Sequence, residues 1–434
     1  MTLDSFFKIK ANGSTVKTEI IAGITTFLTM AYIIFVNPDI LHQTGMDKNA
    51  VFVATCIAAA FGTAFMGLVA NYPMAIAPGM GLNAYFTFSV CLGMNIPWQQ
   101  ALGAVFISGC IFLAVSLFKV RELIVNAIPY SLKLAISAGV GLFLALIALK
   151  SAGIVVGHPV TLVTLGNVKT HEALFAMLGF FLILALEYRR IHGSIIISIL
   201  AITALSILMG YTEFHGIFSI PPVGDMMENT FLKMDIKSAL NAGLVGVIFI
   251  FFFVDLFDTT GTLIGVAHRA NLLDKHGKLT RLKRALLADS VAIVAGAALG
   301  TSSCTAYIES SAGTTVGGRT GLTSLVVALL FIAALWLSPL AGIVPAFATA
   351  PALCYVAILM SRGLAEINWN DLTESAPAVI TAISMPFTYS IADGVAFGFI
   401  SYTLFKLLSG RLKDLSPTVV IITILWIVKF AYFA

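Results

Sequence analysis

The chain alternates long apolar runs with short polar breaks from Glu19 to Phe433. Most runs contain about 17 to 25 residues, the length a helix needs to cross the hydrocarbon core of a bilayer. The pattern predicts an all-α integral membrane protein with about fourteen transmembrane segments. We expect one integral membrane domain over 1–434, divided into a first repeat (about 19–210), a linker (about 211–240), a second repeat (about 241–410) and an extra terminal hydrophobic segment (about 416–432).

Two of the apolar runs contain residues that interrupt a helix. The third run of the first half includes "IAPGMGLNAYF" (76–86), and the third run of the second half is "GTSSCTAYIESSAGTTVGG" (300–318). Proline lacks a backbone donor, and glycine permits unusual backbone angles and close approach. Irregular backbone at membrane depth is tolerated only where it is buried in protein or lines a cavity. We therefore predict two broken spans, each with a half-helix whose first amides face the interior.

The two interrupted runs occupy equivalent places in the two halves. An odd number of spans per half would invert the second half relative to the first, as in many secondary transporters with a site at the bilayer midplane. We therefore predict two inverted repeats of seven spans, with a ligand site at the broken third and tenth spans. A glycine-rich helix-packing face is the alternative explanation of 76–86. The loose dinucleotide-binding match at 79–84 lacks the strand and helix context that such a motif needs.

Three acidic residues lie inside apolar runs. Asp255 and Asp258 in "FFFVDLFDTTGTLIGVA" are one helical turn apart, and Thr262 shares a face with Asp258. Glu309 lies in the interrupted run of the second half. A carboxylate at membrane depth indicates a functional site, because burying its charge without a partner is costly. If Asp255 and Asp258 face one small cavity, they repel each other when both are ionised, so this pair predicts a proton switch.

Other polar positions have alternative explanations. Thr26 either lines the cavity or bonds back to its own helix. An ion pair with Arg319 is the structural alternative for Glu309. We expect Asp289, which follows a basic loop, to form an ion pair at the inner surface. Asp393 is expected to cap a helix or to lie in the turn before one.

Composition and charge exclude several classes of protein. Hydrophobic residues make up 59% of the 434 residues and charged residues 11%, less than half of the roughly 25% usual for soluble domains. The basic residues lie in short loops, most densely from His268 to Arg284, which predicts a cytoplasmic N-terminus and argues against nucleic-acid binding. The five cysteines show no paired spacing, and no H-E-x-x-H pattern occurs, so we expect no metal site and no enzyme.

Five stretches together point to a known family. "APGMGLNAYF", "FDTTGTLIGVA", "GTSSCTAYIESSAG", "GGRTGLT" and "PFTYSIADG" occur in this order over nearly the whole chain. They resemble the azaguanine-like adenine, guanine and hypoxanthine permeases of the nucleobase/ascorbate transporter superfamily. The resemblance implies a core domain from spans 1–4 and 8–11 and a gate domain from spans 5–7 and 12–14. It also implies that the third and tenth spans each hold a short strand before a half-helix.

The resemblance further implies a substrate site built on these stretches. Asp258 and Glu309 would hydrogen-bond a purine base and serve in proton coupling, and Asn83 would belong to the third-span half-helix. Phe257 and Tyr85 are expected to stack on the base. Uracil-type members carry a histidine one turn after the first acid, where this chain has Thr262. The expected substrate-binding set is Asp258, Glu309, Asn83, Gly81, Ala84, Tyr85, Thr262, Ile308, Tyr307 and Thr26.

The sequence thus predicts a multi-pass inner-membrane permease that imports a purine base by proton symport with an elevator-type movement. A proton is the expected coupling ion, no cofactor is expected, and the resemblance allows a homodimer. Adenine, guanine and hypoxanthine all stay open, with overall likeness favouring adenine. The alternatives are an anion transporter or channel of the same superfold, which would be expected to carry neutral or cationic residues in place of Asp258 and Glu309, and an intramembrane enzyme.

Overall fold

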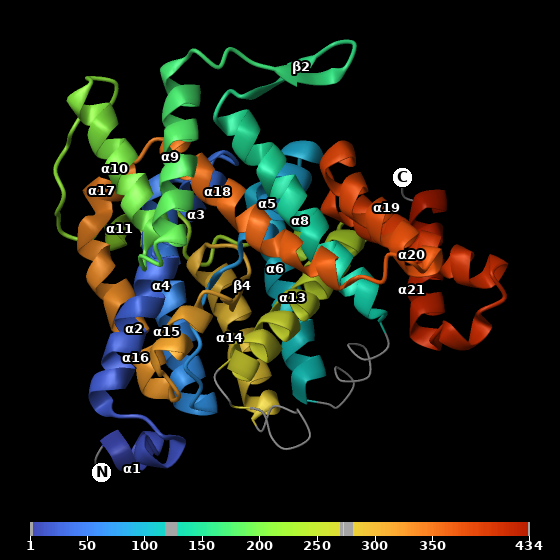
Figure 1. Cartoon of the computed structure of the whole chain (residues 1–434), viewed down its shortest axis with the longest axis horizontal. Coiled ribbons are helices and arrows are strands. Elements are labelled where there is room, and N and C mark those ends of the chain that lie inside the picture. The colour runs from blue at the N-terminus through green and yellow to red at the C-terminus, as the bar shows by residue number, and fades with distance from the viewer. Residues whose placement is uncertain (1–2, 118–127, 270–271, 273–280, 433–434) are drawn as a thin grey trace. The chain divides into compact units, whose positions relative to one another are not determined.

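The computed structural model describes residues 3–117, 128–269, 272 and 281–432, and the chain is mostly helical (Figure 1). Its contacts divide it into a first unit, Met1–Leu117 with Leu178–Thr349, and a second unit, Phe118–Met177 with Ala350–Ala434. Most of the basic loop between His268 and Arg284 lies outside the described residues.

Helices make up most of the first unit, and two of them, α9 and α18, run on into the second. The elements are α1 (Leu3–Phe7), η1 (Lys10–Asn12), α2 (Val16–Met30), α3 (Ile33–His42), α4 (Lys48–Phe65), η2 (Met66–Ala70), β1 (Ile76–Pro78), α5 (Met80–Ala84), η3 (Tyr85–Gly93), α6 (Trp98–Leu117), α9 (His171–Tyr188), α10 (Ser194–Leu208), α11 (Val223–Asn229), α12 (Ile236–Ala239), α13 (Ala242–Arg269), α14 (Leu282–Leu299), β4 (Cys304–Ala306), α15 (Ser310–Val316), α16 (Gly321–Ala334), η4 (Leu335–Leu337), α17 (Ser338–Ile343) and α18 (Ala346–Ser361).

A buried carboxylate joins the first helix of the apolar pattern to a helix far along the chain. Thr15 caps α2 by accepting a hydrogen bond from the amide of Thr18. One turn later, Glu19 is fully buried and accepts from the backbone amides of Arg319 (2.9 Å) and Thr320 (3.2 Å) at the start of α16. The exposed N–H groups at a helix start favour a negative charge. Glu19 therefore stabilises the start of α16 and fixes α2 beside it.

The helices have the lengths and composition of membrane spans. Among the described residues, eight helical stretches are long and apolar enough to cross a membrane. They are Val16–His42, Lys48–Ala70, Trp98–Ser116, Tyr130–Ser151, His171–Tyr188, Gly321–Ile343, Ala346–Glu366 and Ile391–Leu408. Shorter apolar helices cover Ser194–Leu208, Leu244–Leu256 and Pro417–Ala431. The prediction of a mostly helical membrane protein is confirmed.

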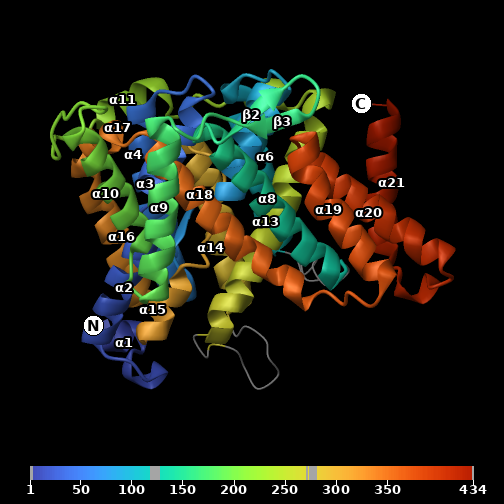
Figure 2. The ribbon, with the colours of Figure 1, turned by 45° about the horizontal axis from the view of Figure 1, so that its top comes forward.

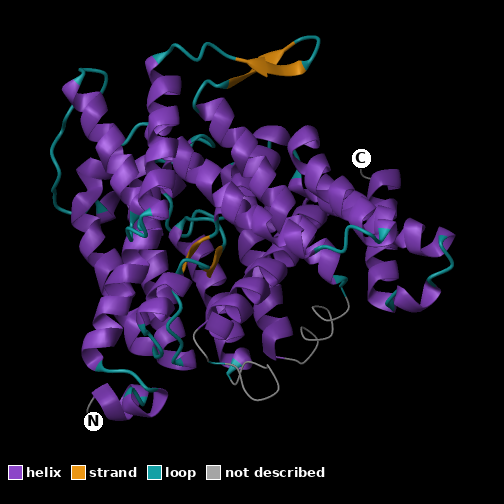
Figure 3. Ribbon diagram, in the orientation of Figure 1, coloured by secondary structure: helices purple, strands orange, loops and turns teal. Residues whose placement is uncertain are grey.

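The described part of the second unit contains the packed helices α8, α19 and α20, a hairpin and the terminal helix, together with most of α18 and the first part of α9. Its elements are α8 (Tyr130–Ser151), β2 (Val155–His158), β3 (Leu162–Leu165), η5 (Arg362–Glu366), α19 (Leu372–Thr388), α20 (Ile391–Leu408), η6 (Leu412–Asp414) and α21 (Pro417–Tyr432). The β2–β3 hairpin, which the apolar pattern does not predict, is largely exposed (Figure 3).

Helix α21, formed by the extra terminal segment, lies beside α20 (Figure 2). The hydroxyls of Thr403 and Thr423 are 2.7 Å apart, and Lys429 lies 3.4 Å from Asp393. Asp393 occupies the first turn of α20, and Ser390 is the cap because its side chain accepts from the Asp393 amide. The expectation that Asp393 itself caps the helix is therefore wrong.

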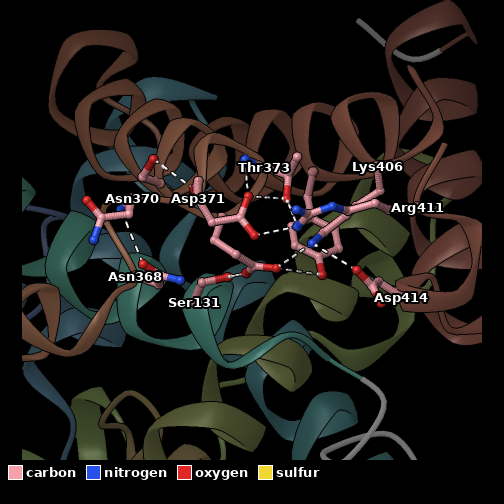
Figure 4. Close-up of polar contacts among 11 residues, drawn as sticks. Ser131, Asn368, Asn370, Asp371, Thr373, Lys406, Arg411 and Asp414 are labelled. Carbon is pink, nitrogen blue, oxygen red and sulfur yellow. Dashed lines mark hydrogen bonds and ion pairs between the residues drawn. The ribbon is translucent and has the colours of Figure 1, made fainter. Parts of the chain in front are cut away.

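One end of the second unit is held by a cluster of charged side chains (Figure 4). Lys406 is only 2% exposed, and its ammonium group lies 2.6 Å from Glu374 and 3.4 Å from Asp414. Arg411 pairs with Asp371, the cap of α19. A buried ammonium is stable only when it is paired and hydrogen-bonded. The cluster thus connects α19, α20 and the segment that follows α20.

Candidate functional site

Both broken spans contain the short strands that the family resemblance implied, and the strands pair with each other. Strands β1 and β4 are antiparallel, with Ala77 opposite Thr305. The pairing continues from the Gly79 amide to the Ser303 carbonyl (2.9 Å) and from the Tyr307 amide to the Ala75 carbonyl (2.9 Å). Every residue of both strands is buried. The prediction of a short strand within each of the two interrupted runs is confirmed.

An isolated two-stranded sheet has unpaired edges, and side chains of two neighbouring helices satisfy them. Thr63 of α4 exchanges two 2.9 Å hydrogen bonds with the backbone of Ile76 in β1. Asp289 of α14 accepts from the amide of Ala306 in β4 at 3.1 Å and from the hydroxyl of Thr259 at 2.7 Å. Asp289 is fully buried, so the expected position at the inner surface is wrong. Its carboxylate instead supports the strand pair.

Glycine allows this backbone to pack closely at two points. A side chain at Gly79 would begin 2.7 Å from the methyl group of Thr305. A side chain at Gly313 in α15 would meet the hydroxyl of Thr26 and, at 2.6 Å, the carbonyl of Ala22. Larger residues would push apart the segments that meet here. Thr26 is 1% exposed, so it lies in the packed contact between α2 and α15.

Glu309 is partly exposed at the start of α15. The hydroxyl of Tyr32, which lies between α2 and α3, donates to its Oε1 at 2.8 Å. The hydroxyl of Thr29 lies 3.5 Å from the backbone carbonyl of Glu309. The guanidinium of Arg319 donates instead to the carbonyls of Thr314 (2.5 Å) and Gly318 (2.8 Å). The alternative explanation of Glu309 as an ion pair with Arg319 is therefore wrong.

Asp258 of α13 belongs to the same group of polar side chains. It is partly exposed, and its charge interacts with that of Glu309 and with the hydroxyl of Tyr307. Asp255, one turn earlier, is fully buried and accepts from the hydroxyl of Ser303 at 2.6 Å. Of the two neighbouring acids in α13, Asp258 is therefore the one near Glu309, while Asp255 holds the segment before β4.

The side chain of Asn83 is hydrogen-bonded to other residues of the protein. Its amide nitrogen donates to Oδ1 of Asn37 at 2.6 Å, and its oxygen accepts from the hydroxyl of Ser302. Asn37 in turn donates to the hydroxyls of Thr55 (2.7 Å) and Thr301 (2.9 Å). All five side chains are fully buried. The network joins α3, α4, α5 and the segment before β4, and it places Asn83 as a support for the broken span.

The remaining predicted site residues differ in exposure. Tyr85 is fully buried with its ring 5.0 Å from that of Phe251, and Tyr307 is 5% exposed and donates to the carbonyl of Pro78 at 2.5 Å. Gly81 and Ala84 of α5 and Thr262 of α13 are buried, whereas Ile308 is 41% exposed. The side chain of Phe257 lies outside the described residues.

The start of α15 differs from the prediction of free backbone amides. The amides of Ser310, Ser311 and Ala312 donate to the carbonyls three residues earlier, at 3.1, 2.9 and 2.9 Å. These three amides are thus used in turns, and the prediction is wrong for them. Over the described part of the chain, no group of three or more His, Cys, Asp or Glu residues is arranged to hold a metal ion.

Comparisons with known proteins agree with this architecture. A model of the Permease family matches residues 17–427. The chain is 51% identical over 430 residues to the adenine permease AdeP of Escherichia coli (strain K12), covering 99% of this chain and 96% of that protein. It is 43% identical over 430 residues to the guanine/hypoxanthine permease PbuO of Bacillus subtilis (strain 168), covering 98% and 99%.

A solved structure shares the fold at low sequence identity. The transmembrane domain of a cyanobacterial bicarbonate transporter, BicA, matches with a TM-score of 0.66 at 16% identity, over 87% of this chain and 97% of that one. The family match extends over nearly the whole chain, and the identities to curated permeases are high. The chain therefore belongs to the Permease family and is a multi-pass membrane transporter, not an enzyme.

Proposed function

We propose that this permease imports a purine base together with a proton, and that Asp258 and Glu309 bind the base and carry the coupling. The observation that carries the proposal is that two partly exposed carboxylates from different spans lie within electrostatic range of each other, beside the buried strand pair. A purine presents N–H donors beside ring-nitrogen acceptors. An ionised carboxylate accepts from it, and a protonated one also donates. The names of the relatives AdeP and PbuO support a purine as the substrate.

Repulsion between the two carboxylates provides a physical basis for coupling. When both are ionised in a poorly solvated site, their repulsion raises the energy of the empty transporter. A proton on one of them relieves that repulsion and supplies a donor for the base. Substrate and proton therefore favour each other's binding, which is what symport requires.

We further propose fourteen spans in two inverted repeats of seven, with the substrate site on a core domain that moves against a gate domain. The side chains that hydrogen-bond the edges of the β1–β4 pair favour an inverted repeat. Thr63 lies in the apolar run before β1, and Asp289 lies in the run before β4, and each satisfies the strand that follows it. In an inverted repeat, equivalent spans carry out equivalent tasks. We place the N-terminus in the cytoplasm because the basic loops then face inward.

An anion transporter shares the fold, since the BicA domain carries bicarbonate by name. In this chain, Asp258 and Glu309 would repel an anion, and no cation pairs with Glu309 among the described side chains. The carboxylates therefore favour a neutral base with N–H groups over an anion.

Uptake measurements test the proposal. Cells without purine permeases of their own that express this chain should accumulate radiolabelled adenine, and unlabelled adenine should compete more strongly than guanine or hypoxanthine. The comparison also decides which base is preferred. Failure to transport any of the three bases, with the protein present in the membrane, would remove the proposed function. Transport of bicarbonate or sulfate instead would favour the anion alternative.

A further inference from the structure

The junction between α2 and α3 lies directly against the acid of the tenth span. Tyr32 is at this junction, is 1% exposed, and donates to Oε1 of Glu309 at 2.8 Å. In the last turns of α2 before Tyr32, the hydroxyl of Thr29 donates to the carbonyls of Thr25 (3.2 Å) and Thr26 (2.8 Å). Because α15 also packs closely on α2 at Gly313, the distance from Tyr32 to Glu309 is set by rigid packing.

The side chains around Glu309 leave the hydroxyl of Tyr32 to stabilise its carboxylate. Among the described side chains, the ionisable groups that interact with it are Asp258 of α13, Tyr307 of its own segment and Tyr32. None of them is a cation, and Arg319 is engaged with backbone carbonyls. Among the described side chains, Tyr32 is the hydrogen-bond donor to this carboxylate. A carboxylate with little solvent and no cation depends on such donors for its ionised form.

We propose that Tyr32 is a positioning residue that fixes the orientation of the Glu309 carboxylate toward the base and favours its ionised form. The inference rests on the proposed function of Glu309. The hydroxyl engages Oε1 of Glu309, and a carboxylate has further lone pairs that can accept from the N–H groups of a base.

The test compares Tyr32→Phe with wild-type protein in proteoliposomes. The substitution removes one oxygen and keeps the ring. We expect KM for adenine to rise about tenfold, because the carboxylate loses its fixed orientation and a charge-assisted hydrogen bond. Without this donor the ionised form of Glu309 is disfavoured. In a plot of uptake against pH, the part of the curve that follows protonation of Glu309, its acid limb, should therefore move to higher pH by about one unit. A merely structural role would not move this limb.

Tyr72→Phe is the matched control. Tyr72 is also fully buried in the first unit, and its hydroxyl accepts a 3.0 Å hydrogen bond from the Arg281 amide instead of donating to Glu309. We expect the control to keep the wild-type pH profile even if it lowers thermal stability. An unshifted profile and unchanged KM in folded Tyr32→Phe would overturn the inference, as would an equal shift in the control.

An isosteric replacement covers the case in which Tyr32→Phe does not fold. Incorporating 3-fluorotyrosine at position 32 keeps the ring and hydroxyl but makes the hydroxyl a stronger donor. The limb should then move to lower pH, opposite to the phenylalanine variant, and no movement would overturn the inference. The effect should also disappear in a Glu309→Gln background, measured by adenine binding. Wild-type protein that binds no purine would defeat the proposed function itself, which separates the two failures.

Discussion

Replacing Asn83 with alanine tests whether this residue supports the broken span or contacts the base. The family resemblance placed Asn83 in the substrate site. In the structure, however, the side-chain nitrogen of Asn83 donates to Asn37 and its side-chain oxygen accepts from Ser302. The substitution would leave Oδ1 of Asn37 without its donor and the hydroxyl of Ser302 without its acceptor. Both groups are fully buried, so water cannot readily replace the lost partner.

The size of the effect follows from these two groups. Leaving a buried polar group unsatisfied costs about 1 to 3 kcal/mol, so the two together cost about 2 to 6 kcal/mol. For a chain of 434 residues, such a loss should lower the melting temperature by about 2 to 7 °C. Asn37→Ala removes the other half of the network and should lower it similarly. Since both substitutions remove the same hydrogen bond, the double variant should be less destabilised than the sum of the single variants.

The assay combines thermal melting of purified protein with adenine binding by the fraction that remains folded. Thr87→Val is the matched control, because Thr87 is fully buried in the same span and its hydroxyl has no hydrogen-bond partner among the described residues. It should change the melting temperature little. A large loss of adenine affinity in Asn83→Ala with an unchanged melting temperature, and no effect of Asn37→Ala, would refute the supporting role.

Three further predictions concern the site and the charged cluster. Glu309→Gln keeps the shape but loses the charge-assisted hydrogen bond, about 1.5 to 3 kcal/mol, so purine affinity should fall by one to two orders of magnitude in equilibrium binding. Gly81→Val should abolish uptake while membrane expression persists, because Gly81 is buried in α5; normal uptake would favour the packing explanation. The hydroxyl of Thr373 and the guanidinium of Arg411 lower the pKa of Asp371 to about 2. This carboxylate thus contributes stability above about pH 4 that is lost as the pH falls toward 2, and Asp371→Asn should flatten that part of the melting profile.

Local residue chemistry made the interrupted spans predictable. Pro78, Gly79 and Gly81 lie within four residues of an apolar run, and this combination disfavours a regular spanning helix. The same reasoning located the interruption around Glu309. The register of β1 against β4 could not be predicted, because it depends on contacts between segments more than 200 residues apart. The β2–β3 hairpin was missed since its exposed apolar residues look like part of a loop between spans.

The site residues show a similar division. An acidic residue inside an apolar run is unusual enough to indicate a functional site, so Asp258 and Glu309 were predicted from the sequence. Tyr32 was not, because a tyrosine in "MAYIIFV" has the same appearance as a packing aromatic. Asp289 and Asn83 were misplaced for the opposite reason: their polarity suggested a surface or a ligand, while the structure gives them distant backbone and side-chain partners. Such pairings are set by tertiary structure.

The measurement that bears most directly on coupled purine transport is adenine uptake into proteoliposomes with and without a pH gradient, acid outside. Wild-type uptake should be accelerated by the gradient. Asp258→Asn mimics the protonated acid permanently, so adenine binding or exchange should persist while the gradient no longer drives accumulation. Equal acceleration in the wild-type protein and Asp258→Asn would contradict the coupling role of Asp258, and a wild-type protein that moves no purine under either condition would contradict the account as a whole.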